Sequence, residues 1–119
     1  MSQIINSKQY DLEERTYQFS KKARDYIKQL PRTISNIEYG KQLIRSSGSI
    51  GANYIEANES LSKKDFIMRV KICKKEAKES RYWLKLAEPI KEQIQEQEYL
   101  IKEVIELMKI FGSIIENTK

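Results

Sequence analysis

Apolar residues recur at helical spacing along most of the chain, in four separate segments. In the first, from about residue 12 to residue 30, they fall within one narrow arc at about 100° per residue. Pro31 should end this helix, and Asp11 is placed to cap its start. Residues 1–10 lie outside the pattern, and we expect a flexible N-terminal segment there. The predicted buried face consists of Leu12, Thr16, Phe19, Ala23, Tyr26, Ile27 and Leu30.

The second segment begins near residue 35 or 36 and runs to about residue 60. Gly40, Gly48 and Gly51 each weaken a helix by about 1 kcal/mol relative to alanine, so this stretch could also be a loop. The large apolar residues nevertheless keep helical spacing throughout. We therefore predict a helix whose small residues let another backbone approach closely. Its predicted core face is Gly40, Leu43, Ser47, Ile50, Gly51, Tyr54 and Leu61.

The third segment has the clearest start, because Ser62 and Asp65 have the spacing of a helix cap. It should continue to about residue 88, where Pro89 ends or bends it. Its core face should contain Phe66, Val70, Cys73, Ala77 and Leu84.

Residues 90–97 read as a polar connector that can hold a helical turn, and a fourth helix follows over about residues 98–116. Short connections between amphipathic helices favour antiparallel neighbours. The pattern therefore predicts an all-α protein, an antiparallel up-down four-helix bundle, in a single domain over residues 1–119. The buried face of the fourth helix should be Leu100, Val104, Leu107, Met108, Phe111, Ile114 and Ile115.

Charge is concentrated in the third helix. Between residues 63 and 86, nine Lys or Arg against three acidic residues give +6, whereas the whole chain is only +5. Seven of the basic residues share an arc of about 120°, with Tyr82 in its middle. Such a stripe favours an anionic partner, although charged helix faces are more often simply solvated. The basic stripe consists of Lys64, Lys71, Lys74, Lys75, Lys78, Arg81 and Lys85.

A further strip of the third helix lies between the basic stripe and the core face. It carries Trp83, and a lone bundle subunit needs only one apolar face per helix, so we expect a partner subunit to cover this strip. The strip contains Met68, Ile72, Glu76, Glu79, Trp83 and Leu86.

A polar seam is expected beside the core face of the second helix. Its spacing places Arg45, Ser49, Ala52, Asn53 and Glu56 together. Arg45 can pair with Glu56, Glu76 or Glu79. A nucleotide or metal pocket would use such groups, but a plain ion-pair network within or between subunits fits them better. We therefore predict that Arg45, Ser49, Asn53, Glu56, Ile72, Glu76, Glu79 and Trp83 form a polar seam and oligomer interface.

The chemistry-bearing residues are sparse. There is no histidine, which removes the commonest general base and transition-metal ligand, and the single Cys73 falls on the core side of its helix. Di-iron bundles use Glu-x-x-His pairs, which this chain cannot form. We expect no catalytic residues, no metal, no cofactor and no enzymatic activity.

No run of about 18 apolar residues is present, and the N-terminus lacks the layout of a secretory signal. The apolar side of the basic helix is assigned to the core, so it is not free to lie on a bilayer. We expect no membrane association and a cytoplasmic location.

Several stretches together resemble the four-helix bundle proteins named for the 23S rRNA intervening sequence, also called S23-like. The similar text is RSSGSIGAN at 45–53, EA at 56–57, SKKDF at 62–66 and KEAKESRYWL at 75–84. The commoner family pattern has Glu-Gly where this chain has Glu56-Ala57. The resemblance covers about residue 10 to the C-terminus, and it implies an antiparallel bundle that assembles as a homopentamer. The family is also distantly similar to the basic accessory protein of diversity-generating retroelements.

Two functions follow as hypotheses. The first is a non-enzymatic oligomer that binds the backbone of RNA or DNA through the basic stripe, with salt-dependent affinity. The second is a protein-binding scaffold ring that recruits a partner protein or enzyme and has no affinity for nucleic acid. Sequence-specific readout is not indicated, because the chain has no recognised groove-reading module.

Overall fold

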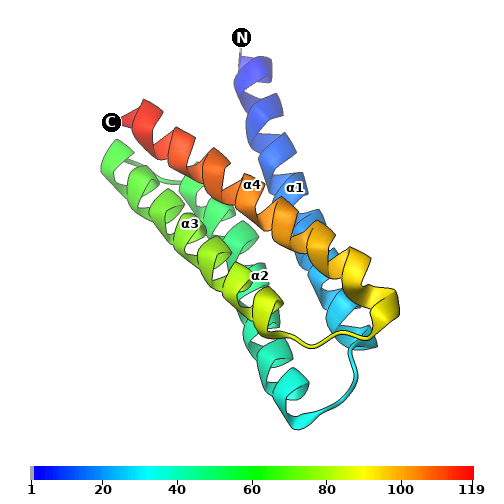
Figure 1. The fold of residues 1–119 in the computed structure, drawn as a ribbon. Helices are drawn as coiled ribbons and strands as arrows, with labels where there is room; N and C mark the ends of the chain where they lie inside the picture. Colours follow the sequence, from blue (N-terminus) through cyan, green and yellow to red (C-terminus); the bar gives the residue numbers. More distant parts are fainter. Residues whose placement is uncertain (1) are drawn as a thin grey trace.

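The chain folds into four long helices. The computed structural model describes residues 2–119, and it describes side chains from residue 11 onward. Successive helices run in opposite directions, so α1 begins and α4 ends at the same end of the molecule (Figure 1). The fold is the predicted all-α, antiparallel four-helix bundle. The elements are α1 (Ser2–Gln29), α2 (Ile34–Asn58), α3 (Lys63–Leu86), a short 3-10 helix η1 (Lys91–Gln93) and α4 (Ile94–Thr118).

The helix boundaries differ from the expected ones mainly at the starts of α1 and α4. Because α1 begins at Ser2, Asp11 lies inside the helix, and the prediction that it caps the start is wrong. Met1 and the side chains of residues 2–10 lie outside the described part, so the flexibility expected over residues 1–10 stays a prediction. Helix α4 begins at Ile94, four residues before the expected start, because no residue after Pro89 interrupts a helix.

The core lies between the helices, on the faces that the apolar spacing predicts. The predicted faces of α1, α3 and α4 are buried or half-buried throughout. Leu61 is the exception, because α2 already ends at Asn58 and leaves Leu61 fully exposed in the turn that follows. The largest fully buried side chains are Phe19, Phe111, Leu43, Ile50, Leu84, Leu100 and Leu107.

Two glycines of α2 set how closely α1 approaches. A Cβ atom added to Gly51 would lie 3.0 Å from Thr16 Oγ1, and one added to Gly40 would lie 3.0 Å from Ile27 Cγ2. Gly48 differs, because nothing lies within 4 Å of its added Cβ. The predicted close approach of another backbone is therefore confirmed at Gly40 and Gly51, and the neighbouring helix is α1.

Side-chain caps fix the chain reversals. Ser62 Oγ accepts a hydrogen bond from Asp65 N at 3.1 Å, which confirms the predicted start of α3. At the other end of the bundle, buried Asn36 joins two turns, since its Nδ2 donates to Pro31 O at 3.0 Å and to Glu88 O at 2.9 Å. Its Oδ1 also accepts from Glu88 N at 2.8 Å. One amide thus holds the α1–α2 turn against the end of α3.

Polar contacts bridge α1 and α4, which pack against each other less extensively than the pairs α1–α2, α2–α3 and α3–α4. Arg15 donates two hydrogen bonds to Glu103, from Nε at 2.7 Å and from Nη2 at 2.9 Å, and the ion pair raises the pKa of Arg15. Two turns further along α1, Lys22 Nζ donates to Tyr99 Oη at 3.1 Å. We call these two contacts between α1 and α4, Arg15–Glu103 and Lys22–Tyr99, the polar latch.

Candidate nucleic-acid interface

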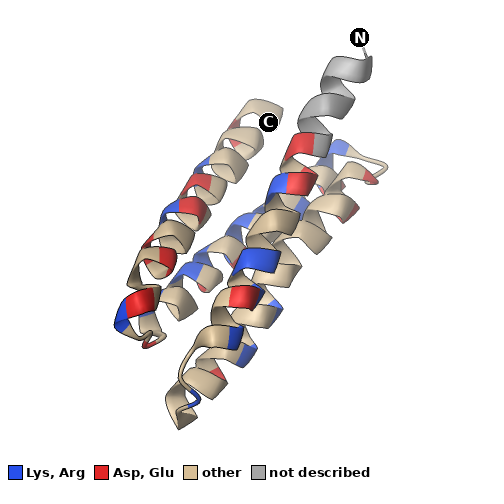
Figure 2. Cartoon of the chain, turned by 90° about the vertical axis from the view of Figure 1, so that its right-hand side faces the viewer, with Lys and Arg blue, Asp and Glu red and all other residues tan. Residues whose placement is uncertain are grey.

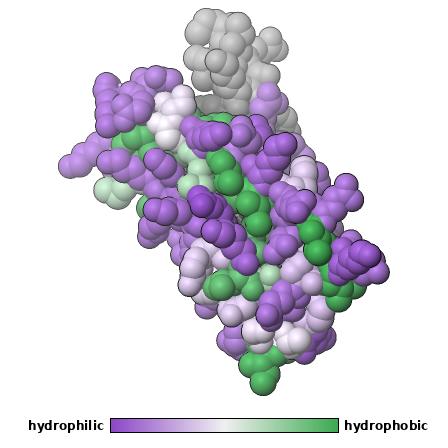
Figure 3. All heavy atoms as spheres, in the orientation of Figure 1, coloured by the Kyte–Doolittle hydropathy of each residue, from purple (hydrophilic) through white to green (hydrophobic). Residues whose placement is uncertain are grey.

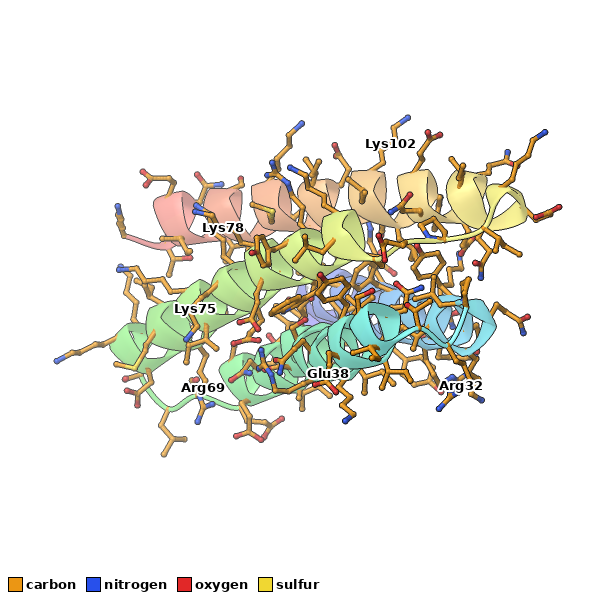
Figure 4. All side chains as sticks on the ribbon, turned by 60° about the horizontal axis from the view of Figure 1, so that its bottom comes forward. Arg32, Glu38, Arg69, Lys75, Lys78 and Lys102 are labelled. Carbon is orange, nitrogen blue, oxygen red and sulfur yellow. The ribbon has the colours of Figure 1, made fainter. Side chains whose placement is uncertain are left out.

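The basic stripe is an accessible row of side chains along α3. Six of its seven side chains are exposed and Arg81 is half-buried. None of the seven forms an ion pair with a residue of the described part. Lys75 and Lys78 lie one turn apart, and Lys78 is on the side of α3 nearer α4 (Figure 4). The stripe therefore presents positive charge that is not paired with a carboxylate of residues 11–119.

Charge is distributed unequally between neighbouring helices. Lys and Arg recur along α3, whereas acidic residues outnumber basic ones on α4 (Figure 2). Lys74 lies across this boundary, because a Cβ added to Gly112 of α4 would be 3.5 Å from Lys74 Nζ. An anionic ligand would therefore be held on α3 and repelled at the α4 side.

An aromatic cluster lies beside the basic stripe. The Tyr82 ring packs edge-on against Trp83, with centroids 5.0 Å apart and an interplanar angle of 73°. Trp83 in turn stacks against Tyr39 of α2, with centroids 6.1 Å apart. Trp83 Nε1 also donates to Glu79 Oε2 at 3.1 Å. Tyr82 is thus exposed at the stripe while its neighbours are held in place.

The polar seam joins α2 and α3 within one subunit. Arg45 Nη1 donates to Glu76 Oε1 at 3.2 Å, and Arg45 Nη2 pairs with Glu79. Glu76 is buried, so Arg45 compensates a charge that burial would otherwise destabilise. The hydrogen bond from Trp83 and the pairing with Arg45 lower the pKa of Glu79. The pairing of Arg45 with Glu76 and Glu79 that the sequence allows is therefore present.

The polar seam continues toward the α2–α3 turn through hydrogen bonds that join Ser49, Asn53 and Arg69. Asn53 Nδ2 donates to the carbonyl and the hydroxyl oxygen of Ser49, both at 2.9 Å, and Arg69 Nη1 donates to Asn53 Oδ1 at 2.9 Å. Glu56 is exposed and forms no ion pair with a described residue. The spacing of polar residues along α2 does not reveal Arg69, because Arg69 lies on α3. Its position seven residues before Glu76 places it on the same side of α3, which is the signal that could have identified it.

The strip that contains Trp83 is covered largely by α2 of the same subunit. Trp83 packs on Tyr39, Glu76 is buried by Arg45, and Ile72 is half-buried. Met68 remains 55% exposed. The strip therefore does not require a second subunit to explain its composition, and an oligomer interface at these residues stays a prediction.

Cys73 is a core residue. Its side chain is buried, and burial raises the pKa of the thiol to about 12. A buried thiol with so little thiolate is a poor nucleophile. Within residues 11–119, no three carboxylate or cysteine side chains gather into a group that could hold a metal ion.

A family model that matches most of the chain shows the family to which this protein belongs. The family model described as "23S rRNA-intervening sequence protein" matches residues 8–113. This chain belongs to that family. The match includes the whole polar seam and the whole basic stripe, and it confirms the resemblance found in the sequence.

A solved structure agrees with this assignment. A crystal structure from Bacteroides thetaiotaomicron VPI-5482, described as a protein with unknown function from the S23 ribosomal protein family, is 32% identical in sequence. The alignment covers 87% of this chain and 96% of that chain, with a TM-score of 0.75. No curated protein matches the chain. As a family member, the protein has a four-helix fold shared with a relative whose function is itself unknown.

None of the helices within residues 2–119 combines the length and the apolar character needed to cross a membrane.

Proposed function

We propose that this family member is a non-enzymatic, oligomeric protein that binds the backbone of RNA or DNA through the basic stripe of α3. The observation that carries the proposal is the row of seven basic side chains with no ion-pair partner among the described residues. Lysine and arginine that contact phosphates release bound counterions, and this release drives association at low salt.

Oligomerisation would strengthen such binding. One stripe offers only a few phosphate contacts, whereas the homopentamer implied by the resemblance would present five stripes at once. Linked weak sites can raise the overall affinity by about 100-fold or more when one ligand reaches several of them. Regular phosphate spacing along a nucleic acid suits a repeated, sequence-independent contact of this kind.

A protein-binding scaffold is the second candidate, and exposed apolar residues on the helices favour it. Ile44 and Ile55 on the outer side of α2 are each 50% exposed. Figure 3 also shows a broken apolar band among the polar side chains on the face that α4 crosses. These surfaces suit contacts with protein, either another copy or a different chain.

The experiment is nucleic-acid binding by the purified protein at two salt concentrations, with a variant in which four lysines of the basic stripe are changed to glutamate. The variant carries Lys71→Glu, Lys74→Glu, Lys75→Glu and Lys78→Glu. A control variant makes the same change in charge away from α3, at the exposed residues Lys28, Lys41, Lys91 and Lys102. Light scattering checks that both variants keep the oligomeric mass of the wild type.

If the stripe contacts phosphates, wild-type binding weakens steeply with salt. Four lost contacts would lower the slope of log K against log salt by about 3 for a single strand. The stripe variant should then bind far more weakly than the control variant. Equal loss in the two variants would mean that only net charge matters. No binding by the wild type would refute the proposal and favour the scaffold.

A further inference from the structure

Two apolar surfaces on which a base could stack interrupt the basic stripe, and we call them the apolar stations. The first is a hollow of about 710 Å³ near the start of α3, lined by Lys63, Lys64, Ile67, Met68, Lys71 and Lys119. Its floor is apolar, because Met68 is 55% exposed and Ile67 is half-buried, while lysines form its rim. The second station is Tyr82, whose side chain is 57% exposed. Both stations lie among the lysines of the stripe.

The Tyr82 ring is held in place from behind. It packs edge-on against Trp83, which is itself fixed by the Tyr39 ring and by the hydrogen bond to Glu79. An aromatic ring that is already ordered loses little conformational freedom when a flat ligand stacks on it. Lys78 and Lys85 lie about one turn to either side of Tyr82, where they can reach anionic groups flanking such a ligand.

The distance between the stations gives the ligand a length. Met68 and Tyr82 are 14 residues apart on α3, which is about 21 Å along the helix axis and close to four turns. Lys71, Lys75 and Lys78 fill the interval. Because stacked nucleotides of one strand rise about 3.4 Å each, the distance corresponds to about six rises, so about seven stacked nucleotides, or about six in a slightly extended strand, span both stations.

We infer that the basic stripe selects single-stranded nucleic acid, with one base stacked on Tyr82 and another over the hollow floored by Ile67 and Met68. The inference rests on the proposed function and narrows its ligand. In a duplex the base faces are covered by neighbouring base pairs, so a duplex can use the lysines but neither apolar station. Alternating cations and stacking surfaces are the means by which proteins bind single strands without reading sequence.

The test uses fluorescently labelled oligouridylates of three, six and twelve nucleotides and a labelled RNA hairpin without a single-stranded tail. Three full-length variants are compared with wild type: Tyr82→Leu removes the ring, Tyr82→Phe keeps it, and Tyr17→Leu removes an aromatic ring of α1. Tyr17 is also 57% exposed, so it is a matched control for loss of an exposed tyrosine. Light scattering and circular dichroism show whether mass and helix content are retained.

We expect wild-type affinity to rise between three and six nucleotides by more than the added charge explains, and six nucleotides to bind more tightly than the hairpin. Tyr82→Leu should weaken six-nucleotide binding about tenfold or more and leave hairpin binding unchanged, because a base stacked on an aromatic ring contributes this much. Tyr82→Phe and Tyr17→Leu should bind like wild type. The single tryptophan, Trp83, should lose fluorescence with oligouridylate but not with the hairpin.

Failure of this inference is distinguishable from failure of the proposed function. Salt-dependent binding that the lysine variant abolishes, but that is equal for strand and hairpin and unaffected by Tyr82→Leu, overturns the inference and leaves the proposed function standing. Absence of binding to either RNA overturns both. If Tyr82→Leu loses helix content, unchanged Trp83 fluorescence of the wild type on saturation with oligouridylate still overturns the stacking.

Discussion

The three glycines of α2 give a comparison within a single helix. In a helix interior, glycine is about 0.8–1.0 kcal/mol less favourable than alanine, so each Gly→Ala change has the same intrinsic gain. The three positions differ in the space that is available for the added methyl group. A methyl group at Gly48 meets nothing within 4 Å, whereas one at Gly51 lies 3.0 Å from Thr16 Oγ1 and 3.4 Å from Thr16 Cβ. Gly48→Ala should therefore keep the full gain, and Gly51→Ala should not.

Thr16 cannot easily move away from the added methyl group. Its side chain is fully buried, and its hydroxyl donates within α1, with Leu12 O and Glu13 O both 2.9 Å away. Overpacking of a well-packed site costs typically 1–3 kcal/mol, which equals or exceeds the intrinsic gain. Gly51→Ala should thus be neutral or destabilising by up to about 2 kcal/mol.

Thermal unfolding followed by circular dichroism measures the difference. With about 2.1 cal/mol/K of unfolding entropy per residue, 119 residues give about 0.25 kcal/mol/K, so Gly48→Ala should raise Tm by about 4 °C. The double variant Thr16→Ala and Gly51→Ala should be more stable than the sum of the two single changes predicts, because the clash is gone. Equal stabilisation by Gly48→Ala and Gly51→Ala would refute the close approach of α1.

Four further predictions concern the polar seam and the core. Arg45→Ala should lower the free energy of unfolding by about 1–2 kcal/mol, because buried Glu76 loses its charged partner; an unchanged urea midpoint would contradict this. Since the pKa of Glu79 is lowered in the folded state, its interactions stabilise the protein above the unfolded-state pKa of about 4.3 and are lost as the pH falls through the folded value. Wild type should therefore lose more stability than Glu79→Gln between about pH 5 and about pH 3, and parallel losses would argue against the effect. The Cys73 thiol, with its pKa raised to about 12, should react with a thiol reagent only on unfolding, and rapid modification of the native protein would show otherwise. Tyr26→Phe removes a buried hydroxyl that has no hydrogen-bond partner among the described residues, so Tm should stay constant or rise by a few degrees; a clear fall would reveal a bond made in solution.

Much of the fold is predictable because three helices have simple faces. On α1, the residues from Leu12 to Leu30 recur at strict helical spacing, and burial of that face decides where the helix packs. Pro31 and Ser62 mark turns through backbone chemistry that acts locally. The start of α1 at Ser2 was not predictable in this way, since residues 2–10 carry no comparable apolar arc.

The candidate site is predictable only in part. The basic stripe follows from spacing alone, because all its members lie on one helix. The buried hydrogen bond between Ser46 and Ser80 at 2.8 Å, and the contact of Trp83 with Tyr39, depend on how α2 and α3 cross. Helical spacing says which residues share a face, but not which residue of the neighbouring helix lies opposite. The contact of Tyr39 with Trp83 therefore does not follow from the spacing, and a partner subunit at this strip stays a prediction.

The polar latch between α1 and α4 has a consequence for local opening. Three neighbouring helix pairs are joined by extensive packing, whereas α1 and α4 depend on Arg15–Glu103 and Lys22–Tyr99 across a smaller contact. Arg15 is exposed to water, so the Arg15–Glu103 ion pair weakens as salt rises. Amide hydrogens of α1 should therefore exchange with solvent faster than those of α3, and added salt should widen the difference. The bundle would then behave as a stable α2–α3–α4 unit that α1 closes reversibly.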